Sequence, residues 1–344
     1  MTSPSPGDPP SSSAPLRVGV AGAGHFGRYH ALKVAASPRA RLVGVFDPDT
    51  ERAKTVGWEA GAPDMPLEAL LPAIDALVIA APAEAHHPLA MAALRAGKHV
   101  LVEKPIASTL AQAGEMEALA RETGLVLQVG HLERFSAAYR ALAARTRQVL
   151  YIEAVRIAPF KPRGTDVSVI LDLMIHDLDL VLALVDSPIE SVDAVGAPIA
   201  SPFEDIANAR LRFANGAVAT ITASRVSIRT ERRMRIFARD TYLAADFATR
   251  KLTVIGRGIG TPVPGVAGFG IEEAAWEDHD SLAAEHAAFI ASILDGAPVA
   301  VDAATGRRAL SAALAVATAM EESRARMLAG GLLDQLQDGG GGGL

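Results

Sequence analysis

The sequence predicts an α/β protein with two domains: a doubly wound parallel sheet, followed by an α+β domain with an open, mainly antiparallel sheet. Its 344 residues are half apolar, which suffices for two hydrophobic cores of ordinary size. In the first part of the chain, short apolar runs alternate with Ala/Leu-rich segments of helical length, a pattern typical of parallel strands with crossover helices. Beyond about Phe135, strand-like runs follow one another through short turns, which indicates antiparallel pairing.

The first domain is expected to contain five strands, each a near-continuous apolar run of the kind that is buried on both faces of a sheet. They lie at residues 16–21, 42–46, 76–80, 99–102 and 126–130. Helices are predicted between them, at residues 25–36, 48–56, 85–96 and 109–123.

The second domain is expected to be built mainly from a run of strands. They are predicted at residues 150–156, 189–195, 207–213, 217–224, 234–238, 241–246 and 251–256, and helices at 169–184, 281–294 and 303–328. The pair Asn215-Gly216 between two of the strands is a strong hairpin signal, because both residues tolerate positive φ. The helices are available to cover one face of the sheet.

Composition sets the boundaries and excludes several classes of protein. We expect an unstructured lead-in at residues 1–14, the two domains at 15–132 and 133–330, and a flexible Gly-rich tail at 331–344. The lead-in has neither a basic start nor an apolar core, so it does not look like a signal peptide. The net charge of −6 is mild and interspersed, which argues against nucleic-acid binding, and no apolar run reaches the roughly 20 residues of a membrane span. With no cysteine, disulfides and thiolate chemistry are excluded, and a cytoplasmic location is expected.

A glycine motif after the first strand predicts a dinucleotide site. Gly22, Gly24 and Gly27, with His25 and Phe26 between them, form a G-x-G-x-x-G segment that opens a helix, as in a Rossmann domain. Such glycines allow a tight turn, a close approach of the backbone to the pyrophosphate and close packing of helix on strand.

An acidic residue at the end of the second strand predicts which dinucleotide binds. Asp47 stands about twenty residues beyond the last glycine, where a carboxylate accepts hydrogen bonds from the ribose and repels a 2′-phosphate. The expected cofactor is therefore NAD. Arg52 could bind the 2′-phosphate of NADP, but we expect it to pair with Asp49 or Glu51.

The fourth strand ends in Glu103-Lys104-Pro105, at the edge of the sheet where ligands of α/β folds bind. The Lys104 ammonium could stabilise a developing alkoxide on the substrate. The alternative is a structural lysine that anchors Glu103 in a salt bridge.

The helix predicted at 169–184 carries Asp172, His176 and Asp179 at i, i+4 and i+7, so all three are expected on one face. An imidazole suits removal of a hydroxyl proton near neutral pH, and a neighbouring carboxylate would orient the ring. The alternative is a solvated polar face, which fits poorly with a helix that is apolar almost all round.

Together these motifs resemble the Gfo/Idh/MocA oxidoreductases over almost the whole folded chain. The resemblance lies in the segments 22–27, 81–86, 97–100, 103–105 and 172–176. It implies a catalytic group of Lys104, Asp172 and His176, and cofactor contacts from the glycine segment, Asp47, Pro82, His86, Glu103 and Lys104. It also implies no metal, and a homodimer or homotetramer formed through the second domain. Ala83 departs from the Thr that is common there.

Segments 130–135, 166–170, 235–237 and 242–247 resemble the branch of UDP-N-acetylglucosamine 3-dehydrogenases. That likeness implies oxidation of the 3-hydroxyl of a nucleotide sugar, with an aminotransferase acting next, as in lipid A-type pathways. Substrate contacts are expected from Arg134, Arg163 and Asp179, while Ser136 replaces a common Asn.

Three alternatives stay open at this point. One is a cyclitol or free-sugar dehydrogenase such as an inositol dehydrogenase, and another is a non-catalytic NAD-binding regulatory protein. The residues also leave open whether Lys104 or His176 is the base.

Overall fold

The computed structural model describes residues 14–161, 167–277 and 279–330, and the chain forms two units. The first unit contains the chain up to Leu132 together with Asp280–Arg307, and the second contains Glu133–His279 and the chain from Arg308 onward. The segment 280–307, which was expected in the second domain, therefore belongs to the first. The physical reason is burial, because Phe289 and Ile290 of this segment pack into the first unit's core.

The sheet of the first unit has the order β2-β1-β3-β4-β5, and all of its strands are parallel. The strands are β1 (Leu16–Ala21), β2 (Ala40–Phe46), β3 (Ala76–Ile79), β4 (His99–Glu103) and β5 (Leu127–Gly130). The helices are α1 (His25–Ala36), α2 (Thr50–Ala60), α3 (Leu67–Ala73), α4 (Ala83–Arg95), α5 (Leu110–Thr123) and α8 (Ser281–Leu294). The strand order reverses between β1 and β3, and ligands of open α/β sheets bind at such a point.

Helices cover both faces of this sheet. Apolar side chains of α1, α2 and α8 form one core with residues of β1, β2 and β3, including Val18, Val20 and Val78. On the opposite face, Gly19 of β1 faces Leu70 of α3, and a methyl group at Gly19 would lie 3.0 Å from that side chain. The doubly wound parallel sheet predicted for this part of the chain is confirmed.

The second unit is built on a mainly antiparallel sheet with the order β13-β14-β12-β11-β10-β6-β9-β8-β7, in which only β6 and β9 pair in parallel. Its strands are β6 (Val149–Ile157), β7 (Ile189–Ala197), β8 (Ile206–Phe213), β9 (Val218–Ser224), β10 (Glu231–Ala238), β11 (Thr241–Asp246), β12 (Lys251–Arg257), β13 (Thr261–Pro262) and β14 (Phe269–Ala275). Gly216, with φ +87°, turns the predicted hairpin between β8 and β9.

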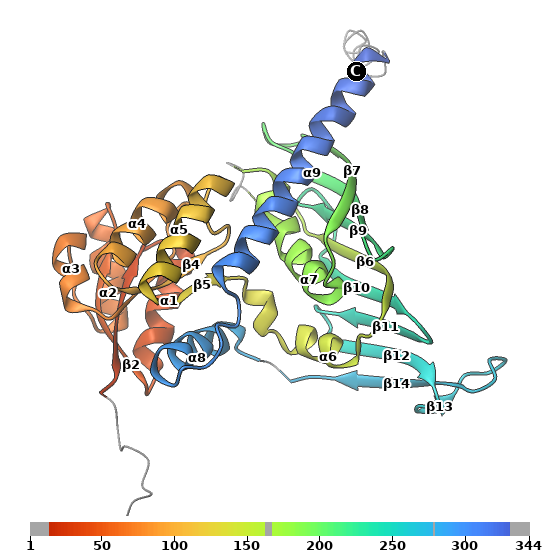
Figure 1. The fold of residues 1–344 in the computed structure, drawn as a ribbon, viewed down its shortest axis with the longest axis horizontal. Helices are drawn as coiled ribbons and strands as arrows, with labels where there is room; N and C mark the ends of the chain where they lie inside the picture. Colours follow the sequence, from red (N-terminus) through yellow and green to blue (C-terminus); the bar gives the residue numbers. More distant parts are fainter. Residues whose placement is uncertain (1–13, 162–166, 278, 331–344) are drawn as a thin grey trace, which may run out of the picture. The chain divides into compact units, whose positions relative to one another are not determined.

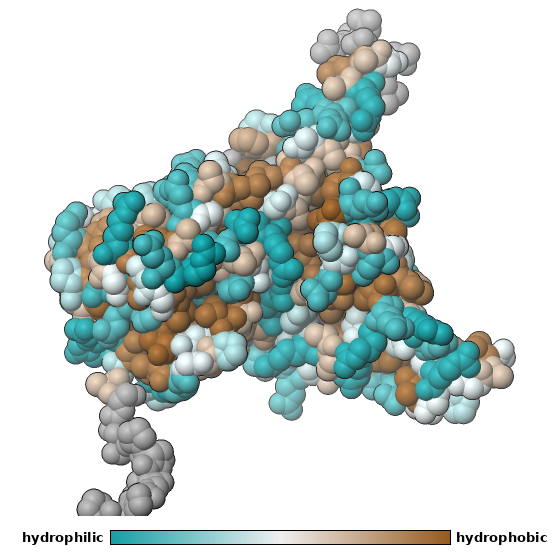
Figure 2. Space-filling model, viewed as in Figure 1, coloured by the Kyte–Doolittle hydropathy of each residue, from teal (hydrophilic) through white to brown (hydrophobic). Residues whose placement is uncertain are grey.

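One face of this sheet is covered by α6 (Ala137–Arg145), α7 (Ile175–Val185) and the part of α9 (Ala303–Ala329) that belongs to this unit (Figure 1). Buried strand residues such as Ile152, Ile221 and Ile236 share one core with Leu178 and Val316 of the helices. The turns of α9 beyond Met320 are largely exposed, and Figure 2 shows both hydrophilic and hydrophobic surface there.

Three features differ from the sequence prediction or lie beyond it. The helix expected at 169–184 is not uniform, because a π-helical turn, Ile170–Met174, precedes α7. Helix α3 and strands β13 and β14 were not predicted. The lead-in and the tail lie almost wholly outside the described residues. Within the described part of the chain, no helix is both long and apolar enough to cross a membrane.

Candidate functional site

The glycine segment forms a narrow turn between β1 and α1. A Cβ atom at Gly22, whose φ is +103°, would lie 2.3 Å from the carbonyl oxygen of Ala80 behind β3. A Cβ atom at Gly27 would lie 1.9 Å from the carbonyl oxygen of Gly22. Both positions therefore exclude any side chain, as predicted for the tight turn and for close packing of α1.

Among the described residues, no side chain of the N-cap residue caps the amino end of α1. Its N-cap is Gly24, which provides no side-chain cap, and a Cβ atom there would meet nothing within 4 Å. His25 and Phe26 begin the helix, and both are exposed. The exposed fraction of Phe26 is 47%. Backbone N–H groups and the positive end of the helix dipole suit a phosphate at this place.

Asp47 holds the turn from the end of β2. Its Oδ2 accepts a hydrogen bond from the N–H of Ala23 at 2.7 Å, and its Oδ1 accepts one from the N–H of Asp49 at 2.9 Å. Arg52, which is 59% exposed, pairs with Asp49 at 2.9 Å, as expected, and also with Asp47 at 3.2 Å. The carboxylate is thus oriented beside the glycine turn, where a ribose-binding acid is required.

Lys104 lies in the turn after β4 and is half-buried. Buried side chains contact the backbone of this turn. The peptide bond between Lys104 and Pro105 is cis. His86, which is 1% exposed, lies between the carbonyl oxygens of Pro105 (2.7 Å) and Ala81 (2.8 Å). Burial lowers the pKa of His86, against the opposing effect of the two carbonyl acceptors. With both nitrogens engaged by backbone, His86 links the turn to α4 and is not exposed as a ligand contact would require.

Glu103 also faces the interior. It was expected to contact the cofactor, but it is only 9% exposed, and its Oε1 lies 2.9 Å from Nε2 of His30 on α1. Its Oε2 accepts a hydrogen bond from the N–H of Lys104 at 3.2 Å. The structure therefore places Glu103 beneath the turn. Pro82, by contrast, is exposed at the N-cap of α4.

Asp172 and His176 lie where the π-turn passes into α7. Asp172 belongs to the π-turn, His176 is the second residue of α7, and both are half-buried. Residues at i and i+4 share a helix face when the helix has 3.6 residues per turn, and a π-turn exceeds that number. π-Turns are rare and are often found at functional sites, so the π-turn at Ile170–Met174 supports a functional role for this segment.

Arg134 and Asp179, both predicted to bind substrate, form an ion pair with each other. Nε and Nη2 of Arg134 donate to the two carboxylate oxygens at 2.6 and 3.0 Å, and Nη1 donates to the hydroxyl of Tyr139 at 3.2 Å. The Asp179 side chain is 1% exposed and that of Arg134 is 14% exposed. Burial alone would lower the pKa of Arg134, but its bonds to Asp179 raise it. Asp179 is therefore a support for Arg134, and only Arg134 retains an exposed edge.

A second buried ion pair, absent from the sequence analysis, supports the start of α7. Arg156 of β6 donates to Asp177 at 2.7 and 3.1 Å and to Glu133 at 2.9 Å. Burial alone would lower the pKa of Arg156, but the two carboxylates raise it, and Arg156 in turn lowers the pKa of Glu133. No sequence signal distinguishes Asp177 from its acidic neighbours on the helix, so only the structure could identify this pair.

The structure thus brings together the glycine turn with Asp47, His86 with the Lys104 turn, and Arg134 with Asp179. Arg163, the remaining predicted substrate residue, lies outside the described residues. The sequence analysis did not single out His30, which is buried and contacts Glu103 at 2.9 Å. It stands on α1 without any motif of its own.

Comparison with known proteins places these features in a family. A family model described as an oxidoreductase family with an NAD-binding Rossmann fold matches residues 16–131, and a model of the GFO/IDH/MocA C-terminal domain matches residues 155–243. The chain is 43% identical over 308 residues to a UDP-N-acetylglucosamine 3-dehydrogenase of Acidithiobacillus ferrooxidans, an alignment that covers 89% of this chain and 97% of that protein.

Two further relatives agree with this assignment. A solved structure of UDP-N-acetylglucosamine 3-dehydrogenase from the same species matches with a TM-score of 0.85 at 42% identity, covering 90% of this chain and 99% of the other. The NAD⁺-dependent scyllo-inositol 2-dehydrogenase of Bacillus subtilis is 32% identical over 232 residues, which is 62% of this chain and 68% of that protein. The chain therefore belongs to the Gfo/Idh/MocA oxidoreductase family and is an NAD-dependent enzyme with a Rossmann domain.

Proposed function

We propose that this enzyme oxidises the 3-hydroxyl of UDP-N-acetylglucosamine with NAD, giving a 3-keto nucleotide sugar. The observation that carries the proposal is the 43% identity, over almost the full length of both proteins, to an enzyme of that name. The second candidate is a cyclitol dehydrogenase, and the scyllo-inositol enzyme favours it at lower identity and over less of the chain.

The residues of the first unit fit NAD. The side-chain-free turn at Gly22 and Gly27, the uncapped amino end of α1 and the oriented carboxylate of Asp47 supply what pyrophosphate and ribose require. Bound there, NAD would supply the nicotinamide ring as the hydride acceptor for oxidation of the hydroxyl-bearing carbon.

We assign the proton chemistry to the chain's own side chains. His176 takes the hydroxyl proton, Asp172 orients the His176 ring, and Lys104 stabilises the negative charge that develops on the oxygen. The roles of Lys104 and His176 can be exchanged without changing the net reaction. In support, the turn that carries Lys104 is held by His86, and the helix that carries His176 is held by the buried pair of Arg156 and Asp177.

Substrate binding is assigned to Arg134, with Asp179 as its support. The bidentate pair fixes the guanidinium plane while leaving 14% of the Arg134 side chain exposed. Arg163, in a segment rich in cationic and Gly/Pro residues, is proposed as a contact for the diphosphate.

Turnover measurements test the assignment. Purified enzyme with UDP-N-acetylglucosamine and NAD should produce NADH, or ketone trapped by a coupled aminotransferase. Lys104→Met and His176→Asn should each lower kcat by about a hundredfold or more, and His176→Asn should retain NAD affinity. Turnover of myo- or scyllo-inositol without turnover of any nucleotide sugar would favour the second candidate. NAD binding without turnover of either class would point to a regulatory protein.

We also propose that the enzyme works in the cytoplasm as a dimer or tetramer, upstream of an aminotransferase. In support, the sheet face opposite the helices of the second unit carries an aromatic row, Tyr151, Phe237 and Tyr242, with ring centroids 5.7 and 5.0 Å apart. Phe237 is 38% exposed, as expected for an interface side chain in a single chain. Phe237→Glu should shift the sedimentation coefficient toward that of a monomer, whereas an unchanged oligomer would exclude this surface.

A further inference from the structure

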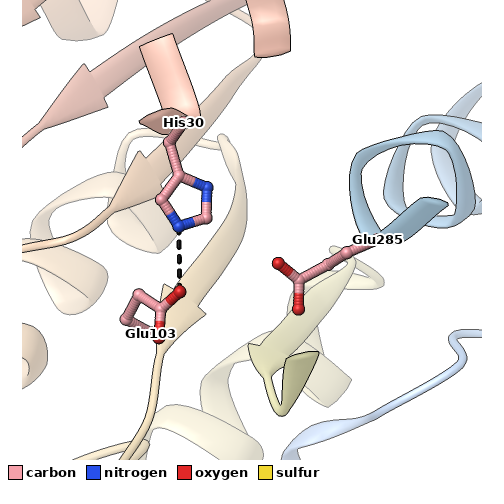
Figure 3. A group of neighbouring side chains, drawn as sticks. All are labelled: His30, Glu103 and Glu285. Atoms are coloured by element: carbon pink, nitrogen blue, oxygen red, sulfur yellow. Dashed lines mark hydrogen bonds and ion pairs between the residues drawn. The ribbon is translucent and has the colours of Figure 1, made fainter. Parts of the chain in front are cut away.

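Four ionisable side chains are buried together beneath the Lys104 turn, and the reaction proposed above uses none of them directly. They are His30 on α1, Glu103 at the end of β4, and Glu285 and His286 on α8, with exposed fractions of 0%, 9%, 0% and 3%. Figure 3 shows the carboxylate of Glu285 directed toward His30 and Glu103. The cluster depends on α8, a part of the segment Asp280–Arg307 that returns to the first unit between the two parts of the second.

A chain of hydrogen bonds runs from α8 to the backbone of Lys104. Nε2 of His286 lies 2.9 Å from Nδ1 of His30, and Nε2 of His30 lies 2.9 Å from Oε1 of Glu103. Oε2 of Glu103 accepts from the N–H of Lys104 at 3.2 Å. A carboxylate can only accept, so Nε2 of His30 carries a hydrogen. In a neutral His30, Nδ1 then accepts from Nε2 of His286, and every donor points toward Glu103.

The two carboxyl groups of the cluster differ in the direction of their pKa shifts. Burial alone would raise the pKa of Glu103, but the hydrogen bond from His30, followed by the charge and N–H of Lys104, lowers it. Burial, with a smaller effect of the Glu103 charge, raises the pKa of Glu285 well above its usual range. Burial also lowers the pKa of His286.

Geometry leads to the same assignment for Glu285. Among the described residues, neither of its carboxylate oxygens has a hydrogen-bond partner, and the nearest ligand atoms of His30, Glu103 and Glu285 all lie within 4.8 Å of one another. Two carboxylates so close in a dry interior cannot both be ionised at reasonable cost. Farther out, Lys33 and Asp280 face His286 and pair with each other, so they add little net charge.

We propose that this cluster holds a single negative charge on Glu103 directly behind Lys104, with His30 and His286 as positioning residues and Glu285 uncharged beside them. The inference rests on the proposed function in one respect, namely that Lys104 acts on the reacting hydroxyl. The carboxylate fixes the Lys104 backbone through its N–H, and its charge favours the ammonium form of the side chain. Lys104 is thereby kept protonated and in place between turnovers.

Two matched substitutions of glutamate by glutamine test the proposal. In Glu103→Gln, the limb of the kcat/KM pH profile that Lys104 contributes should move to lower pH by about one unit, whether Lys104 acts as acid or base, because a stabilising charge is lost. His30→Phe should move it in the same direction, with KM for NAD less affected than kcat. In Glu285→Gln, the limb should stay where it is in the wild type.

Thermal unfolding across pH provides a second readout that needs no substrate. Because the folded state keeps a proton on Glu285 that the unfolded state releases above about pH 4.5, the wild type should lose stability as pH rises from there. Glu285→Gln cannot lose that proton, so its Tm relative to the wild type should rise over the same range.

The outcomes separate failure of this proposal from failure of the proposed function. If Glu285→Gln shifts the limb as Glu103→Gln does, or is destabilised more strongly as pH rises, Glu285 is charged and the proposal is wrong. A stoichiometric divalent metal in the wild type that is lost in Glu285→Gln would also overturn it, since a cation would then hold the carboxylates. If no sugar or inositol is turned over, the proposed function fails, and the unfolding experiment still decides the charge of Glu285.

Discussion

Asp47→Asn should weaken NAD binding and loosen the cofactor turn at the same time. Both oxygens of Asp47 already accept backbone N–H bonds, from Ala23 at 2.7 Å and from Asp49 at 2.9 Å. An asparagine has one accepting oxygen, so either rotamer turns its amide group against one of these donors. Losing a hydrogen bond to a charged group costs about 2 kcal/mol of unfolding free energy. Losing the bonds from the ribose costs a similar amount of binding free energy, about 2 kcal/mol or roughly 30-fold in Kd.

Calorimetric titration of NAD and NADP into the variant measures this effect, and urea unfolding followed by far-UV circular dichroism measures the stability change. Loss of the charge also removes the repulsion of a 2′-phosphate, so the preference for NAD over NADP should fall. Asp49→Asn is the matched control, because Asp49 pairs with the same Arg52 but is 46% exposed, and it should leave both affinities nearly unchanged. An unchanged NAD affinity in Asp47→Asn would refute the assignment of Asp47 to the ribose.

Two further pairs of substitutions test the site and its support. Gly27→Ala should abolish NAD binding, because its methyl group would lie 1.9 Å from the Gly22 carbonyl oxygen; Gly114→Ala, within α5 with no neighbour within 4 Å, should instead raise the free energy of unfolding by about 0.5–1 kcal/mol. Asp177→Asn should cost about 3–5 kcal/mol in urea unfolding, since it leaves Arg156 buried with one carboxylate fewer. Asp75→Asn breaks an ion pair with Arg17 in which the side chains of Arg17 and Asp75 are 44% and 35% exposed, so it should cost much less free energy of unfolding. Equal losses of stability in the two variants would contradict the role given to burial.

Most of the first domain could be predicted because its signals are local. Strand β1 and helix α1 have the predicted bounds, since an apolar run and a glycine turn determine both. The place of Asp47 beside that turn follows from the strand order, which brings the end of β2 next to the end of β1. Local sequence therefore contained enough information for the glycine turn and for Asp47 beside it, but not for the burial of His86 and Glu103 behind the Lys104 turn.

The supports of the second domain could not be predicted in the same way. Asp179 and Asp177 are both acidic residues on a helix, and only tertiary pairing shows that one meets Arg134 and the other Arg156. The π-turn at Ile170–Met174 also escapes a rule that assumes 3.6 residues per turn. Nothing in the periodicity of the helix marks either feature.

The wrong domain assignment of α8 has a different cause: the chain returns to the first unit after a long stretch in the second. The helix α8 has the predicted bounds, but its assignment to the second domain was wrong because Phe289 and Ile290 fit the first core. The same return brings Glu285 and His286 next to His30. The two histidines that meet there, His30 and His286, are 256 positions apart in the sequence. Such proximity leaves no mark in a linear pattern.

The most direct test of the central claim is the transfer of deuterium from UDP-N-acetylglucosamine labelled at C3 of the sugar. Our account predicts that deuterium appears in the reduced cofactor and that kcat/KM shows a primary isotope effect when hydride transfer limits the rate, while label at C4 stays in the sugar. Deuterium in the cofactor from any other carbon, or none from C3 during turnover, would contradict it.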